Sequence, residues 1–308
     1  MNARRASGTR STPRRDVGAG ALDPELFPAS FLRLLSLVPA AVPRLHAGVA
    51  DGRRAVRGEG GRFLFRGHRA YRPGDDLKRV DWNVAARLGR VVVRQLDPER
   101  DLVTEVWLDG SASMGLHGVR VASARLAALA FAIAVAGRGV ARLGILQGGE
   151  ARPLAEGREP GEVRAALERL SATPPTGRAE LAQTLPRVVR RLARGTRFLL
   201  VSDLLTRTDP GVLHGLAGRA VRGALVHVRA PEVHAPEPLG AIVAQDAETG
   251  ESRRLLVDAR VAAEVAARAQ RHADLWAHHA RSVGLRYLPF APSERSEDVL
   301  RRLVLEVP

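Results

Sequence analysis

The stretch Asp109-Gly110-Ser111-Ala112-Ser113 places one carboxylate and two hydroxyls directly after a short apolar run. Oxygen donors of this kind suit a hard cation such as Mg²⁺, which prefers oxygen ligands and retains several waters. Ser111 and Ser113 would bind the ion directly, with Asp109 as a negative charge behind them. Asp and Ser are also good helix caps, so the same residues fit a cap for a helix beginning near Gly118. The stretch alone leaves both interpretations open.

The elements that would position these side chains follow from the hydrophobic pattern. Strands alternate with helices after residue 102, which predicts an α/β domain with a doubly wound, mostly parallel sheet and helices on both faces. Ligands bind such open sheets at the carboxyl ends of the strands. Asp109 ends the expected strand 103–109, and Asp203 closes the apolar run that contains the expected strand 197–202. We therefore expect Asp203 to hold a coordinated water from the side opposite the serines.

The domain organisation follows from the change in pattern along the chain. A disordered basic tail is expected at 1–20, a helix and a Gly- and Arg-rich signature region at 21–101, and the α/β domain at 102–308. A Thr-Gly turn between two extended arms predicts a hairpin insertion near 240–257. The other expected helices are 119–137, 160–171, 180–193, 210–220, 258–283 and 296–304, and the other expected strands are 90–96, 141–147, 151–155, 223–230 and 285–289.

Composition excludes some classes of function. The chain has 308 residues, 45% of them hydrophobic, and it has no cysteine, so a disulfide framework, a thiolate nucleophile and Cys-ligated zinc are all excluded. This composition is compatible with a reducing compartment, and we expect a cytoplasmic protein. The only lysine is Lys78, so a G-x-x-x-x-G-K-[ST] nucleotide-binding loop is excluded as well.

The net charge of +15 raises the alternative of a basic nucleic-acid-binding protein. Nearly all of this charge is arginine, scattered through almost every segment, and aromatic residues make up only 4% of the chain. Few side chains are therefore available to stack on single-stranded bases. We expect no specific nucleic-acid partner, and any binding should be weak and steeply salt-sensitive.

No segment is expected to cross a membrane. The longest apolar stretch, residues 126–136, is shorter than the roughly 20 residues that a transmembrane helix needs, and it indicates a buried helix. The segment 26–42 is apolar but contains Arg33, Pro28 and Pro39. It favours an amphipathic helix, which is compatible with peripheral membrane association.

Two motifs resemble known families. D-G-S-A-S-M after a strand resembles the metal-ion-dependent adhesion site of von Willebrand factor A domains. The upstream RAYRPGDDLKRVDWNVAAR resembles the signature of the bacterial domain-of-unknown-function 58 family, R-x-Y-x-x-G-D-x-x-R-x-x-D-W-x-x-x-A-R. The later SDLL and QDAETGE resemble the family's S-D-F and D-x-E-T-G. The signature positions are occupied here by Arg69, Tyr71, Gly74, Asp75, Lys78 or Arg79, Asp81, Trp82, Ala86 and Arg87.

The resemblance covers about residues 46–305 and implies a von Willebrand factor A-like fold. It also implies a non-enzymatic scaffold or adaptor that acts with a MoxR-type AAA+ ATPase in chaperone-like assembly, binding its partner through a shared Mg²⁺. The metal residues that it implies are Asp109, Ser111, Ser113 and Asp203. Where the family pattern G-x-T-D-L supplies a threonine ligand, this chain has Ala179, which cannot coordinate a metal, followed by Glu180.

The charged residues of the signature region themselves predict a structural role. Arg69, Asp75, Asp76, Arg79, Asp81 and Arg87 lie within nineteen residues. They are expected to form a charge-paired network around Trp82 that locks this region onto the sheet. A surface that docks a partner is the alternative.

A serine hydrolase is the runner-up function. A serine after a strand and before a helix resembles a nucleophile elbow, and the order Ser111 or Ser113, Asp203, then a histidine at 272, 278 or 279 matches α/β-hydrolases. The G-x-S-x-G spacing fails for both serines, however, and the histidines are expected in the middle of a helix.

Overall fold

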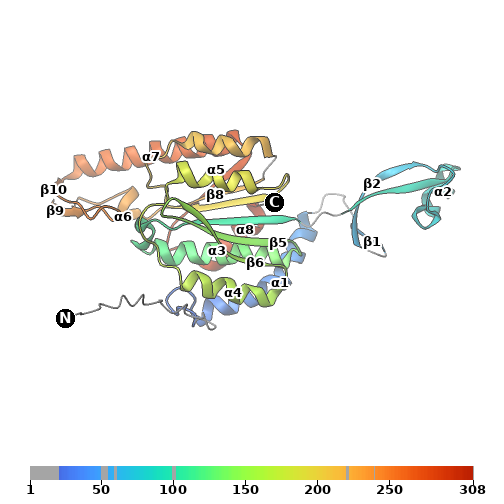
Figure 1. Ribbon diagram of the computed structural model, residues 1–308, viewed down its shortest axis with the longest axis horizontal. Coiled ribbons are helices and arrows are strands. Elements are labelled where there is room, and N and C mark those ends of the chain that lie inside the picture. The colour runs from blue at the N-terminus through green and yellow to red at the C-terminus, as the bar shows by residue number, and fades with distance from the viewer. Residues whose placement is uncertain are drawn as a thin grey trace, which may run out of the picture.

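The computed structural model describes residues 21–49, 55–58, 61–98, 102–219, 222–238 and 240–307. The tail expected at 1–20 lies outside these residues. The described chain forms a large α/β body and a small three-stranded sheet that stands apart from it (Figure 1).

A six-stranded sheet forms the centre of the large body, in the order β11-β8-β7-β4-β5-β6. Its strands are β4 (Val103–Asp109), β5 (Val140–Gln147), β6 (Glu150–Gly157), β7 (Arg197–Ser202), β8 (Arg222–Val228) and β11 (Leu285–Phe290). Every neighbouring pair is parallel except β5 and β6, which are antiparallel. The predicted α/β fold class with a mostly parallel sheet is therefore confirmed.

The two faces of the sheet are covered by different helices (Figure 1). On one face lie α1 (Ala29–Val49), α3 (Val119–Ala136), α4 (Pro160–Ser171) and α8 (Ser296–Glu306). On the other lie α5 (Leu181–Arg191), the 3-10 helix η3 (Pro210–Arg219) and α7 (Ala259–Ser282). Side chains of β4 alternate between the two cores, with Val106 and Leu108 in the first and Trp107 in the second.

Helix α3 is the most deeply buried helix of the first core. It is the one helix in the described residues that is long and apolar enough to span a membrane, but 72% of that stretch is buried inside the protein. Thirteen of its residues are buried, Phe131 completely. Apolar character around the whole helix is what burial against a sheet and other helices requires.

Helix α1 packs against α3 and α8. Phe27, Phe31, Leu35, Val38 and Val42 form a buried stripe at helical spacing. Its apolar side therefore belongs to the core of the large body, whereas the sequence pattern grouped this helix with the signature region. The difference arises because a helical stripe does not specify which surface covers it.

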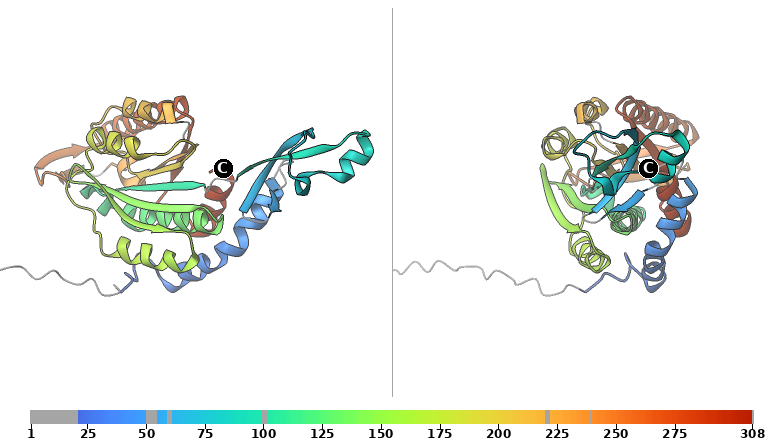
Figure 2. Two further views of the ribbon diagram at one scale, coloured as in Figure 1. Left: turned by 45° about the vertical axis from the view of Figure 1, so that its right-hand side comes forward. Right: turned by 90° about the vertical axis from the view of Figure 1, so that its right-hand side faces the viewer.

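The small sheet consists of β1 (Ala55–Gly58), β2 (Gly61–Ala70) and β3 (Val92–Pro98), in that order and antiparallel. Between β2 and β3 the chain forms the 3-10 helix η1 (Leu77–Arg79) and α2 (Trp82–Leu88). Figure 2 shows this unit projecting away from the large body in a second orientation.

The charges of the signature region pair within this small unit. Arg69 donates two hydrogen bonds of 2.6 Å to Asp75, and this pairing lowers the pKa of Asp75 to about 2. Asp81 interacts with His68 at 3.1 Å and Arg94 at 2.9 Å, which lowers its pKa to about 2 as well. Its carboxylate also caps α2. These contacts join the strands to the turn between them.

The expected charge network forms in part, through Asp75 and Asp81, but it does not enclose Trp82. Trp82 is 63% exposed, and within the described residues Arg79 and Arg87 are exposed and make no ion pair. The indole lies at the start of a seven-residue helix that has no buried residue, and most of its surface is exposed. The charge pairs therefore fix the small unit internally and do not lock it onto the large sheet.

Candidate metal centre at the carboxyl edge of the sheet

Strand β4 is the point at which the order of the sheet reverses. The chain passes from β4 to β5 on one side, and later places β7 on the other side, with all three strands parallel. Connections that leave a sheet in opposite directions open a crevice at its carboxyl edge, where α/β proteins bind ligands. Asp109 is the last residue of β4, and Asp203 directly follows β7, so both carboxylates lie at this edge.

Asp109 organises the loop that follows β4. It is 4% exposed, and its Oδ1 accepts hydrogen bonds from the Ser111 amide at 2.9 Å and the Ser111 hydroxyl at 2.6 Å. Its Oδ2 accepts a 2.6 Å hydrogen bond from the hydroxyl of Ser202, the last residue of β7. Burial nevertheless raises the pKa of Asp109, because these hydrogen bonds only partly offset desolvation. Both of its oxygens hold neighbouring groups in place.

The Ser111 hydroxyl points toward Asp109, whereas the Ser113 hydroxyl lies between Ser111 and the carboxyl of Asp203, whose pKa it lowers. The Ser113 hydroxyl lies 3.1 Å from the Ser111 hydroxyl, which already donates to Asp109. Ser111 precedes the 3-10 helix η2 (Ala112–Gly115) but makes no side-chain capping bond, and the residue that caps α3 is Gly118. The prediction that these residues cap the helix near Gly118 is therefore wrong.

Asp203 carries a buried oxygen without a partner. The residue is 3% exposed, and its Oδ1 accepts a hydrogen bond from the Leu205 amide at 3.1 Å. Its Oδ2 is buried and has no hydrogen-bond partner among the described residues. Burial, and then the charge of Asp109, raise the pKa of Asp203 to about 7. A buried polar atom of this kind is costly, and a bound cation would satisfy it.

His227 holds the backbone of Asp203, and Tyr287 holds the His227 ring. The His227 ring is fully buried, and its Nε2 donates to the Asp203 carbonyl at 2.9 Å. Its Nδ1 accepts a 2.5 Å hydrogen bond from the Tyr287 hydroxyl. Burial and the nearby His234 lower the pKa of His227 to about 3, so the ring is neutral, as this pattern requires. Sequence reasoning missed both residues, although a histidine inside the apolar strand GALVHV was a signal.

The loop before α5 closes the edge but supplies no ligand. The Gly177 carbonyl accepts a 2.9 Å hydrogen bond from the amide of Ala112, between the two serines. Ala179 is buried and has no side-chain oxygen. Glu180 is exposed and its carboxylate lies beside Gly149, so it does not replace the missing threonine.

The oxygen donors at this edge are of the type that Mg²⁺ prefers. No cluster of three or more His, Asp or Glu side chains across the described ranges is arranged to hold a metal. The ion would instead be held by Ser111, Ser113 and Asp203 with Asp109 behind them, and waters would complete its octahedron. When bound, it would supply a positive charge with open coordination positions to a carboxylate from outside the chain.

The geometry gives a hydrolase no support. The serine hydroxyls pair with Asp109 and with each other. The His272 Nε2 lies 2.9 Å from the Leu204 carbonyl, and the His279 Nδ1 lies 3.4 Å from the His214 Nε2. A serine nucleophile needs a base within hydrogen-bond reach, and among the described residues neither histidine is hydrogen-bonded to Ser111 or Ser113.

The signature residues lie far from this edge. Figure 1 shows the small sheet at the end of the body where β4 begins, whereas Asp109 is the last residue of that strand. Arg69, Tyr71, Gly74, Asp75, Arg79, Asp81, Trp82 and Arg87 therefore form a second candidate surface, separate from the metal residues.

The sheet and its edge define a von Willebrand factor A-like α/β domain with a serine and aspartate loop at the switch point. Residues 67–274 match the family described as protein of unknown function DUF58, and the chain belongs to that family. The uncharacterized proteins Rv1480 of Mycobacterium tuberculosis and Mb1516 of Mycobacterium bovis are each 30% identical to it over 236 residues. The alignment covers 74% of this chain and 71% of each relative.

Similar solved structures have low sequence identity. The conserved hypothetical protein BatB from Bacteroides thetaiotaomicron aligns over 67% of this chain and 97% of its own, with 12% identity and a TM-score of 0.41. An aerotolerance-related membrane protein from Bacteroides fragilis gives the same identity and TM-score. The pilus adhesin SpaC from Lactobacillus rhamnosus GG aligns over 84% of this chain and 35% of its own, with 11% identity and a TM-score of 0.35.

Proposed function

We propose that this protein is a non-enzymatic scaffold that captures a protein partner through a Mg²⁺ ion at the carboxyl edge of its sheet. The observation that carries the proposal is the buried, unpartnered Oδ2 of Asp203 beside Asp109 and the two serine hydroxyls. The resemblance of the motifs supports a MoxR-type AAA+ ATPase as the partner, and a chain without cysteine is compatible with the reducing cytoplasm.

The alanine at position 179 leaves the proposed Mg²⁺ site without one oxygen ligand. Without a threonine hydroxyl at this position the cage around the ion is incomplete, so the free protein binds Mg²⁺ weakly. A carboxylate from the partner completes the octahedron. Metal and partner then bind cooperatively, because each supplies part of the other's site.

The signature region supplies a second contact surface in this proposal. Trp82, Leu77 and Leu88 are 63%, 62% and 54% exposed, and the exposed guanidinium groups of Arg79 and Arg87 lie on the same short segments. Exposed Trp and Arg side chains are the types that most often dominate the energy of protein interfaces. The charge pairs of Asp75 and Asp81 keep this surface in a fixed shape.

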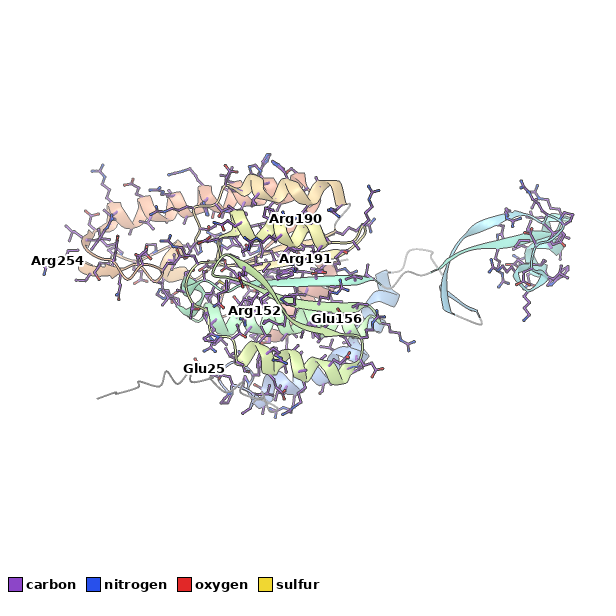
Figure 3. The ribbon with its side chains drawn as sticks, in the orientation of Figure 1. Glu25, Arg152, Glu156, Arg190, Arg191 and Arg254 are labelled. Carbon is purple, nitrogen blue, oxygen red and sulfur yellow. The ribbon has the colours of Figure 1, made fainter. Side chains whose placement is uncertain are left out.

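The positive charge does not favour nucleic acid instead. Figure 3 shows that Arg152, Arg190, Arg191 and Arg254 lie on β6, α5 and β10, spread over the body. Scattered arginines provide only the sequence-independent electrostatic attraction to phosphate.

Calorimetric titration with Mg²⁺ of three proteins tests the metal site. The wild type should bind weakly, Ala179→Thr should bind at least about tenfold more tightly because it restores an oxygen ligand, and Asp109→Ala should not bind. Circular dichroism shows whether Asp109→Ala keeps its sheet, since its loss of binding is informative only in a folded protein. If none of the three binds Mg²⁺, including the threonine variant, the serine loop has only a structural role.

The purified protein is expected to hydrolyse no nucleotide, peptide or ester, because no histidine among the described residues is hydrogen-bonded to either serine hydroxyl. A fluorophosphonate probe should label neither Ser111 nor Ser113. Labelling that disappears in Ser111→Ala or Ser113→Ala would establish the serine hydrolase in place of the scaffold.

A further inference from the structure

A tight turn joins the two strands of the hairpin that follows β8, β9 (Gly240–Gln245) and β10 (Ser252–Val257). The Asp246 Oδ1 accepts hydrogen bonds from the amides of Glu248 and Thr249 at 2.8 and 2.9 Å. The Asp246 carbonyl accepts a third from the Gly250 amide at 2.8 Å. Gly250 has a φ of 73°, which favours glycine. The turn therefore presents the Glu248 side chain from a fixed backbone.

This turn is attached to the loop that closes the serine edge. The Glu248 carboxylate lies 3.0 Å from the Arg178 Nε. Arg178 follows Gly177, whose carbonyl binds the amide between Ser111 and Ser113, and it precedes Ala179. Figure 1 shows the hairpin at the end of the sheet where β4 and β7 terminate. Glu248 is thus attached, from a distant part of the sequence, to the loop that borders the metal residues.

The charges at this edge interact with one another. The Glu248 side chain is 25% exposed, and burial raises its pKa in spite of the ion pair with Arg178. The charges of Asp246 and Asp109 raise it further, and Glu248 in turn contributes to the raised pKa of Asp203. Three carboxylates, Asp109, Asp203 and Glu248, therefore repel one another across the edge, and Arg178 is the cation paired with the most exposed of them. The unpartnered Oδ2 of Asp203 points to a cation as the missing group.

We propose that Glu248 is a further cation-binding residue of the serine edge, acting through a metal-bound water, and that Arg178 opposes it. This inference rests on the proposed Mg²⁺ site. The Glu248 carboxylate partly compensates for the threonine missing at position 179. The Arg178 guanidinium weakens that compensation because it pairs with Glu248. The balance between these two side chains then sets the affinity of the free protein for Mg²⁺.

Opposite changes in Mg²⁺ affinity distinguish this role from a structural one. In calorimetric titrations, Glu248→Gln should bind Mg²⁺ roughly three- to tenfold more weakly, because it removes one nearby negative charge. Arg178→Gln should bind the ion more tightly by a similar factor, because it removes a positive charge and releases Glu248. Glu251→Gln is the matched control, since Glu251 lies in the same hairpin and its side chain is 69% exposed. It should bind Mg²⁺ like the wild type.

Different outcomes of these titrations distinguish a failure of the inference from a failure of the proposed function. If Glu248→Gln and Arg178→Gln change the affinity in the same direction, the ion pair only anchors the hairpin and the inference is wrong. If Glu248→Gln has no effect while Asp109→Ala abolishes binding, the inference fails and the Mg²⁺ site stands. If the wild type and Ala179→Thr both fail to bind Mg²⁺, the proposed function and the inference fall together.

Discussion

Replacing Asp203 with asparagine is expected to stabilise the metal-free protein at pH 8. The carboxylate has a pKa of about 7 in the folded protein, against an ordinary value of 3.8, because it is buried beside Asp109. A raised pKa means that the folded state holds the proton more tightly, so stability present at acid pH is lost as the pH rises through 7. A shift of this size lowers the free energy of unfolding by about 2–4 kcal/mol at pH 8. Asparagine removes the charge and keeps the shape.

Thermal unfolding at pH 8 with a chelator measures this effect. The melting temperature of Asp203→Asn should exceed that of the wild type by at least about 4 °C. Added Mg²⁺ should then raise the melting temperature of the wild type and leave the variant unchanged, because a ligand stabilises only the state that binds it. A variant less stable than the wild type without metal would show that the Asp203 charge is compensated within the protein.

The substitution Gly223→Ala should have the largest effect on folding. Gly223 has a φ of 136°, and a Cβ at this position would lie 1.9 Å from the carbonyl oxygen of Phe198 on the neighbouring strand β7. The obstacle is backbone in the centre of the sheet, so it cannot rotate away as a side chain would. We expect a loss of about 3 kcal/mol or more in the free energy of unfolding, measured by urea denaturation.

Gly195→Ala is the control for this experiment. Gly195 also has a positive φ, 78°, but a Cβ there would meet no atom within 4 Å. Its alanine variant should lose only about 1 kcal/mol, which is the cost of the backbone conformation alone. Equal losses in the two variants would mean that the sheet can separate locally at Phe198.

The fold could be predicted from the sequence because local pattern and tertiary burial agree in it. The apolar run 126–136 lies in the buried helix α3, and the apolar runs that end at Asp109 and Asp203 are central strands. The sequence predicts a helix at 210–220, and the described part of it, Pro210–Arg219, is the 3-10 helix η3 and not an α-helix. Pro210 and three glycines lower its helix propensity, which favours the tighter, shorter turns.

The candidate site could be predicted only where its residues lie close in sequence or end a strand. Asp109, Ser111 and Ser113 are neighbours, and Asp203 is placed by the rule that parallel strands end at one edge. Ser202 belongs to a recognisable Ser-Asp pair, but its bond to Asp109 depends on the adjacency of β7 and β4. Tyr287 reaches Asp203 only through His227, from a strand more than eighty residues further along the chain. No sequence spacing encodes that contact.

The error at Trp82 has a similar cause. A tryptophan among alternating charges is compatible with a buried anchor or with an exposed contact residue, and the residue types are the same in both cases. The charge pairs were predictable because Arg69 and Asp75 lie six residues apart on either side of a turn. Whether the unit they form packs on the large sheet is decided by surface complementarity, which the local pattern does not contain.

The small sheet and the serine edge lie at opposite ends of strand β4 (Figure 1). A molecule bound at the small sheet therefore does not overlap with a molecule bound at the serine edge. The body between them is held together by two continuous hydrophobic cores, one on each face of the sheet. One molecule at the small sheet and another at the serine edge can therefore be bound at the same time without competing for space.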